Sequence, residues 1–179
     1  MPEHDLKLRF SRRYSMGHRL VSGVAPKCRI PHGHDEVVTV DIASANDAAL
    51  DPETNMLVEF EVAKGRWFEW IDSAVDHSFH IGDNDPLIGY FRDNEPELTA
   101  RLLVTPGDPT TEVRAACYLA KLTAFLDAGG HGLVCSRVQI QETPTNAVEI
   151  SAPHTKRYLP AGESHWWHRP DQSTNDLGS

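Results

Sequence analysis

Histidines 32 and 34 flank a single glycine at the start of a β-branched run, and this spacing predicts a strand that must pair with an earlier segment. Residues two apart on an extended strand project from the same face, so both imidazoles can reach one metal ion. His18 supplies a third nitrogen if the segment that carries it pairs with the run beginning at His32. Three nitrogen ligands leave one tetrahedral position open, as in catalytic zinc sites. We therefore expect a catalytic zinc, with the Cys28 thiol beside it.

Two strand pairs and two helices account for most of the periodic sequence, in the order ββααββ. Alternating and β-branched runs indicate the strands, and apolar residues at helical spacing indicate the helices. The expected elements are strands over 6–16 and 32–42, helices over 60–76 and 110–129, and strands over 133–142 and 147–150. Residues 81–109 are rich in Pro, Asp, Asn and Gly and are predicted to be mostly loop, although 102–104 would suit a short strand.

Length and composition suit one domain over residues 1–151, followed by an irregular C-terminal tail over 152–179 that we expect to be partly disordered. The adjacent tryptophans of this tail, Trp166 and Trp167, are costly to leave in water, so they would dock on this subunit or on a neighbour. Their flanking histidines resemble a metal pair, but in a loose tail that spacing is more simply incidental.

Charge and targeting signals narrow the functional classes. The net charge of −9 argues against general nucleic-acid binding, yet residues 6–33 hold basic side chains and no acidic one. That basic segment would attract an anionic substrate such as a phosphate ester, or it is a solvated strand face. No apolar run is long enough to cross a membrane, and the N-terminus lacks a secretory signal, so a cytoplasmic protein is expected. Three unclustered cysteines fit reduced thiols better than disulfides.

Six short motifs together resemble the 6-pyruvoyl-tetrahydropterin synthases and their bacterial relatives, the 6-carboxy-tetrahydropterin synthases. They occur in the order that the family has, over most of Phe10 to Ile150. The motifs are Tyr14-Ser15-x-x-His18-Arg19-Leu20, Cys28-x3-His32-Gly33-His34, Leu57-Val58-Glu59-Phe60, Asp76-His77, Pro109-Thr110-Thr111-Glu112 and Glu142-Thr143. The resemblance implies an α+β tunnelling fold (T-fold), in which an antiparallel sheet carries two helices on one face. It also implies assembly into barrels, as a homo-oligomer that is a hexamer in this family.

The resemblance also assigns roles to residues. It implies Zn²⁺ ligation by His18, His32 and His34, and proton transfer by Cys28 and by an acid and imidazole pair, Asp76 and His77. It further implies that Glu142, Thr110 and Thr111 bind the pterin ring. From the residues alone, Asp76-His77 is equally a helix end with a dipole-stabilised histidine. The two threonines are equally a helix cap, and Glu142 is equally an exposed acid.

Within the family, the three residues between Cys28 and His32 resemble the 6-carboxy enzymes. The activity implied is conversion of 7,8-dihydroneopterin triphosphate to 6-carboxy-5,6,7,8-tetrahydropterin, with loss of acetaldehyde and triphosphate, on the route to queuosine. The alternatives are elimination of triphosphate to give 6-pyruvoyl-tetrahydropterin, or a pterin- or metal-binding homologue without turnover. A zinc hydrolase is a weaker alternative, because no His-Glu-x-x-His helix motif occurs.

Overall fold

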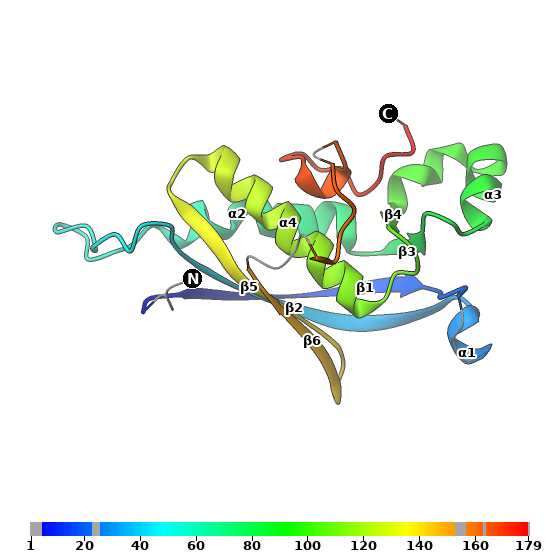
Figure 1. Cartoon of the computed structure of the whole chain (residues 1–179), viewed down its shortest axis with the longest axis horizontal. Helices are drawn as coiled ribbons and strands as arrows, with labels where there is room; N and C mark the ends of the chain where they lie inside the picture. The colour runs from blue at the N-terminus through cyan, green and yellow to red at the C-terminus, as the bar shows by residue number, and fades with distance from the viewer. Residues whose placement is uncertain (1–4, 23–25, 153–156, 163, 179) are drawn as a thin grey trace.

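A computed structural model describes residues 5–22, 26–152, 157–162 and 164–178. It consists of one six-stranded sheet with helices across one face (Figure 1). The strands are β1 (Leu8–His18), β2 (His32–Ser44), β3 (Ser78–Gly82), β4 (Leu102–Thr105), β5 (Leu133–Thr143) and β6 (Asn146–Ser151). The helical elements are α1 (Pro26–Arg29), α2 (Phe60–Trp70), the π-helical turn η1 (Ile71–Val75), α3 (Leu87–Asn94), the 3-10 segment η2 (Pro96–Arg101), α4 (Thr111–Gly129) and the 3-10 turn η4 (Trp166–His168).

The four long strands form the two predicted antiparallel pairs. β1 pairs with β2 from Leu8 opposite Ile42 to His18 opposite His32. β5 continues the sheet beside β2, and β6 pairs back on β5. Because side chains alternate along each strand, one face of this sheet is apolar and packs under the helices. The predicted α+β architecture is confirmed.

Helices α2 and α4 cover the apolar face of the sheet (Figure 1). α4 begins at its N-cap Thr110 and ends where Gly130 adopts a left-handed φ of 70°, as the capping pattern predicts. Trp67 and Trp70 of α2 are fully buried and contact the Tyr118 ring of α4 edge-on. These large rings fill the space between the two helices and the sheet.

Residues 81–109 are not mostly loop, contrary to what their composition predicts, and the short strand expected over 102–104 is present as β4. β3 and β4 extend the sheet beyond β1, in the order β4-β3-β1-β2-β5-β6, and both are parallel to β1. A parallel neighbour needs a crossover connection, which α2 provides on the helical face. With α3, the two strands enclose a second small core of Ile81, Ile88, Leu102 and Val104. Elements this short acquire their stability from tertiary packing rather than from local preference.

The described part of the C-terminal tail is folded against the domain, which corrects the expectation of partial disorder. Trp166 and Trp167 are 1% and 3% exposed, so both tryptophans dock on their own chain. The Trp166 indole donates to the Val104 carbonyl at 2.7 Å, and Val104 N–H donates to Thr174 O at 2.9 Å. The tail is thereby hydrogen-bonded along the outer edge of β4. Residues 153–156, which join the tail to β6, lie outside the described ranges.

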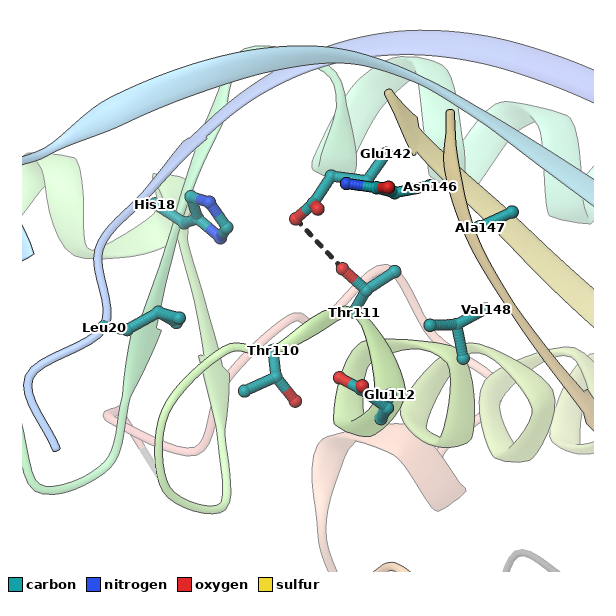
Figure 2. A pocket seen from close by; sticks show the side chains of 9 residues that line it. All are labelled: His18, Leu20, Thr110, Thr111, Glu112, Glu142, Asn146, Ala147 and Val148. Atoms are coloured by element: carbon teal, nitrogen blue, oxygen red, sulfur yellow. Dashed lines mark hydrogen bonds between the residues drawn. The ribbon is translucent and has the colours of Figure 1, made fainter. Parts of the chain in front are cut away.

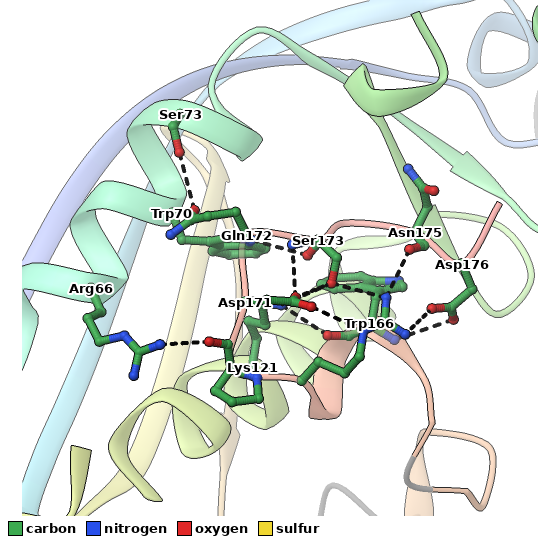
Figure 3. Close-up of polar contacts among 12 residues, drawn as sticks. Arg66, Trp70, Ser73, Lys121, Trp166, Asp171, Gln172, Ser173, Asn175 and Asp176 are labelled. Atoms are coloured by element: carbon green, nitrogen blue, oxygen red, sulfur yellow. Dashed lines mark hydrogen bonds and ion pairs between the residues drawn. The ribbon is translucent and has the colours of Figure 1, made fainter. Parts of the chain in front are cut away.

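A buried lysine anchors the tail to α4 (Figure 3). The Lys121 ammonium donates to Trp166 O at 3.0 Å and pairs with Asp171 at 3.2 Å, and it lies over the Trp70 and Trp166 rings. Tail and helix therefore share one packed cluster. No helix in the described part of the chain combines the length and the apolar character that a membrane span requires.

Candidate functional site

The three predicted ligand histidines meet at one end of the long hairpin. His18 lies directly opposite His32 in the β1–β2 ladder, and His34 follows two residues later on the same face. Their ring centroids are 4.5, 5.1 and 5.1 Å apart, and one nitrogen from each ring lies within 4.8 Å of the others. The cross-strand register thus brings the rings together, because residues facing each other on paired strands have neighbouring side chains.

The hydrogen bonds of His18 and His32 leave the Nε2 lone pair of each ring free for a metal. His18 Nδ1 lies 3.3 Å from the Pro109 carbonyl and His32 Nδ1 lies 2.9 Å from the Ile30 carbonyl, so each Nδ1 carries the proton. Both Nε2 atoms are then bare, yet they lie 3.0 Å apart and cannot bond to each other. Burial and the Arg114 charge lower the pKa of His18 to about 4, which keeps this ring neutral. Neutral imidazoles with Nδ1 fixed by a carbonyl are the usual metal ligands, so these residues fit a divalent ion.

A cavity of about 280 Å³ opens beside His18 (Figure 2). All three predicted ring-binding residues line it. Thr110 and Thr111 come from the start of α4, and Glu142 comes from the end of β5. The Thr111 hydroxyl donates to Glu142 Oε1 at 3.0 Å, and Thr110 Oγ1 accepts from Val113 N–H as an N-cap. The cavity therefore places a carboxylate and a helix N-terminus in one recess with His18 of the histidine cluster.

A buried ion pair behind this cavity was not anticipated from the sequence. Arg114 and Glu36 are both fully buried and form two hydrogen bonds, at 2.6 and 2.8 Å, while the Tyr14 hydroxyl donates to Glu36 at 2.6 Å. Arg114 also donates to Thr111 Oγ1 at 3.1 Å and lies 3.6 Å from Glu142 Oε1. The sequence did carry a signal for this pair, because β2 and α4 each have a charged residue at a position that faces the core. Glu36 precedes the inward-facing valines of β2, and Arg114 lies in the apolar part of α4.

The predicted acid and imidazole pair lies just before β3, beside Ser15 of β1. His77 has a left-handed φ of 58°, and this turn lets its Nδ1 approach Asp76 Oδ2 at 2.7 Å. Asp76 Oδ1 accepts from Ser15 N–H, and His77 N–H donates to Ser15 O, both at 2.8 Å. The His77 side chain is 76% exposed. Among the described residues, no hydrogen bond or ion pair links this pair to the histidine cluster.

Cys28 lies on the single helical turn α1, in the connection between β1 and β2. It is half-buried, and its carbonyl accepts from Leu20 N–H at 2.8 Å. That bond ties α1 to the chain two residues beyond His18. The thiol makes no hydrogen bond to any described residue. The other cysteines, Cys117 and Cys135, are buried, and burial raises the pKa of both thiols.

The sequence model of one protein family, described as 6-pyruvoyl tetrahydropterin synthase, matches residues 7–153. The chain belongs to this family. The match spans both hairpins and the whole histidine cluster, so the family resemblance predicted from the short motifs is confirmed.

Similar proteins agree with this membership. A protein of Rickettsia felis named 6-carboxy-5,6,7,8-tetrahydropterin synthase is 28% identical over 137 residues, which cover 76% of this chain and 94% of that protein. An uncharacterized protein of Wolinella succinogenes has a solved structure that is similar with a TM-score of 0.63, at 22% identity over 83% of this chain and 100% of the other. The 6-pyruvoyl tetrahydropterin synthase of Caenorhabditis elegans has a TM-score of 0.56, at 21% identity over 83% of this chain and 96% of the other. The shared fold is the tunnelling fold.

Proposed function

We propose that this protein is a zinc-dependent lyase that converts 7,8-dihydroneopterin triphosphate to 6-carboxy-5,6,7,8-tetrahydropterin, releasing acetaldehyde and triphosphate. Family membership supports pterin chemistry, and the names of the Rickettsia relatives support the 6-carboxy product. The short spacing between Cys28 and His32 supports the same product. A place on the route to queuosine follows from that product.

The observation that carries the proposal is the convergence of three histidine nitrogens beside a cavity that also holds a carboxylate. His18, His32 and His34 would hold Zn²⁺ and leave a fourth position for the substrate. When bound, the metal supplies Lewis-acid polarisation of oxygens on the substrate side chain.

The opposite end of the substrate would bind at Glu142. A pterin ring presents an amino group and a ring N–H side by side, and a carboxylate accepts both. Thr110 and Thr111, at the N-terminus of α4, complete this end of the cavity. The ring is then anchored at Glu142 while its side chain extends toward the histidines.

Two groups would move protons at the side chain. Cys28 would act as thiolate and remove or relay a proton, because a nearby dication favours the charged form of a thiol. His77, oriented by Asp76, would return a proton. The exposure of His77 at a strand edge supports a site shared between subunits, in which one chain's His77 serves another chain's histidine cluster.

Assembly as a homo-oligomer, with the hexamer of the family as its form, would bring these parts together. β6 lies at one edge of the sheet, and β3 covers β1 only over Met16–His18. The rest of β1 therefore has no strand partner on that side within the described residues. Unpaired strand edges favour pairing with another chain, and barrels formed between subunits would remove them.

A second candidate is 6-pyruvoyl-tetrahydropterin synthase activity, which the description of the family model and the Caenorhabditis elegans neighbour favour. It would use the same residues to eliminate triphosphate without breaking a carbon–carbon bond. A homologue that binds a pterin or a metal without turnover is the remaining alternative.

The test is to incubate zinc-loaded protein, and its Cys28→Ala variant, with 7,8-dihydroneopterin triphosphate and identify the products by mass. A carboxy-tetrahydropterin with acetaldehyde, lost in the variant, is the expected result. A pyruvoyl product would assign the sister activity, and no turnover by assembled, zinc-loaded protein would favour the binding role. Unchanged turnover in Cys28→Ala with zinc still bound would exclude the thiol mechanism.

A further inference from the structure

The buried Arg114 determines the direction of a hydrogen-bond chain that ends in the cavity. A guanidinium has only donors, so the Arg114 N–H that points at Thr111 must be accepted by the Thr111 oxygen. The single hydroxyl proton of Thr111 is then directed elsewhere, and its partner is Glu142 Oε1 at 3.0 Å. The order of donation is therefore Arg114 to Thr111 to Glu142.

Glu36 and Tyr14 hold Arg114 in the orientation that this chain requires. Both Glu36 oxygens accept from the two terminal nitrogens of Arg114, and the Tyr14 hydroxyl donates to the same carboxylate. Neither Glu36 nor Arg114 contacts solvent. A fully buried, bidentate pair cannot rotate without leaving a charge unpaired, so the guanidinium remains aimed at Thr111.

We propose that Arg114, fixed by Glu36 and Tyr14, is a positioning residue that makes the side chains of Thr111 and Glu142 accept hydrogen bonds from a ligand and never donate them. The Thr111 hydroxyl has no proton left for a ligand, and a carboxylate has only acceptors. Both side chains line the cavity, and Figure 2 shows the Thr111 hydroxyl bonded to the Glu142 carboxylate there.

Because both side chains only accept hydrogen bonds, they determine which edge of a ligand ring can bind there. An edge with adjacent N–H donors, such as the 2-amino and ring N–H of a 2-amino-4-oxopteridine, would be bound. An edge with a carbonyl in place of the amino group, as in a 2,4-dioxopteridine, would face these acceptors and be disfavoured, since neither the Thr111 nor the Glu142 side chain offers its oxygen a donor. The inference rests on the proposed function for the identity of the ring. It adds that Arg114 and Glu36, which lie behind Thr111, contribute to the discrimination between amino and oxo ligands.

The experiment compares the dissociation constants of a 2-amino-4-oxopteridine and its 2,4-dioxo counterpart for the zinc-loaded protein, by calorimetry. Wild type is expected to prefer the amino ligand. The Glu36→Met/Arg114→Met double variant removes both charges together, because removing one alone would leave the other buried and unpaired. Thr111→Val removes the hydroxyl and leaves the ion pair in place. Both variants are expected to lower the preference for the amino ligand by at least about tenfold.

Two control variants separate positioning from general loss of structure. Lys121→Met removes another buried cation from α4, two turns beyond Arg114, and is expected to keep the wild-type preference. Thr111→Ser retains the hydroxyl and is also expected to keep it. A wild-type preference in Thr111→Val, or in the folded double variant, would overturn this inference alone. Failure of wild type to bind the 2-amino ligand would instead overturn the proposed function and the ligand class inferred from it.

Discussion

Trp166 is the residue whose replacement most directly tests how the C-terminal tail is held. Its indole is 1% exposed, stacks on Trp70 with ring centroids 6.0 Å apart, and donates to the Val104 carbonyl at 2.7 Å. Removing a buried tryptophan side chain costs about 3–5 kcal/mol. The Val104 carbonyl, left without its donor, adds about 1 kcal/mol. Trp166→Ala is therefore expected to lower the free energy of unfolding by about 4–6 kcal/mol.

Urea unfolding at one fixed protein concentration measures this loss. Thermal melting gives a second measure, because the same loss lowers the Tm of a chain of this size by about 8–24 °C. Trp166→Phe keeps most of the ring contacts and loses the hydrogen bond, so a loss of about 1–2 kcal/mol is expected. Tyr158→Ala serves as the control within the tail, because that ring is exposed and its removal should change stability by less than about 0.5 kcal/mol. A Trp166→Ala protein as stable as the Tyr158→Ala protein would refute the docking of the tail on α4 and β4.

Three further predictions concern the metal, the buried pair and pH. His32→Ala is expected to lower the zinc content, measured by atomic emission, below about one tenth of wild type, because two histidines hold Zn²⁺ weakly. The exposed His131→Ala should leave the zinc content unchanged, and full zinc in His32→Ala would exclude the proposed ligand set. Glu36→Ala is expected to lower the free energy of unfolding by about 3–5 kcal/mol, because the Arg114 guanidinium is left buried and unpaired; a loss below about 1 kcal/mol in urea unfolding would contradict that role. Burial lowers the pKa of Lys121 to about 8, whereas the ordinary lysine pKa is about 10.4. Between pH values of about 8 and 10.4 the native state therefore binds fewer protons than the unfolded chain. The free energy of unfolding of wild type, relative to that of Lys121→Met, should then rise by up to about 3 kcal/mol as the pH increases across that interval. Identical pH profiles of urea unfolding for the two proteins would refute this expectation.

Local sequence patterns were sufficient to predict the four long strands and both long helices. Leu8 and Phe10 alternate with charged residues, and helix α4 carries a capping threonine at one end and a glycine at the other. These signals act within a few residues, so they can be read without knowing the fold. Of the two short strands, β4 was indicated only by the apolar run over 102–104 and β3 was not indicated, because four or five residues in a strand depend on neighbours distant in sequence.

The sequence by itself determined which residues could ligate a metal, because the two-residue spacing of His32 and His34 projects both rings from one face of any strand. Only the tertiary structure decided that Arg114 and Glu36 meet behind Thr111 and that the tail is hydrogen-bonded along the edge of β4. Residues 78 positions apart cannot be matched by a local pattern, since their contact depends on how helix α4 crosses the sheet. The physical reason is that periodicity records which face a side chain occupies, whereas packing alone selects the partner that it finds there.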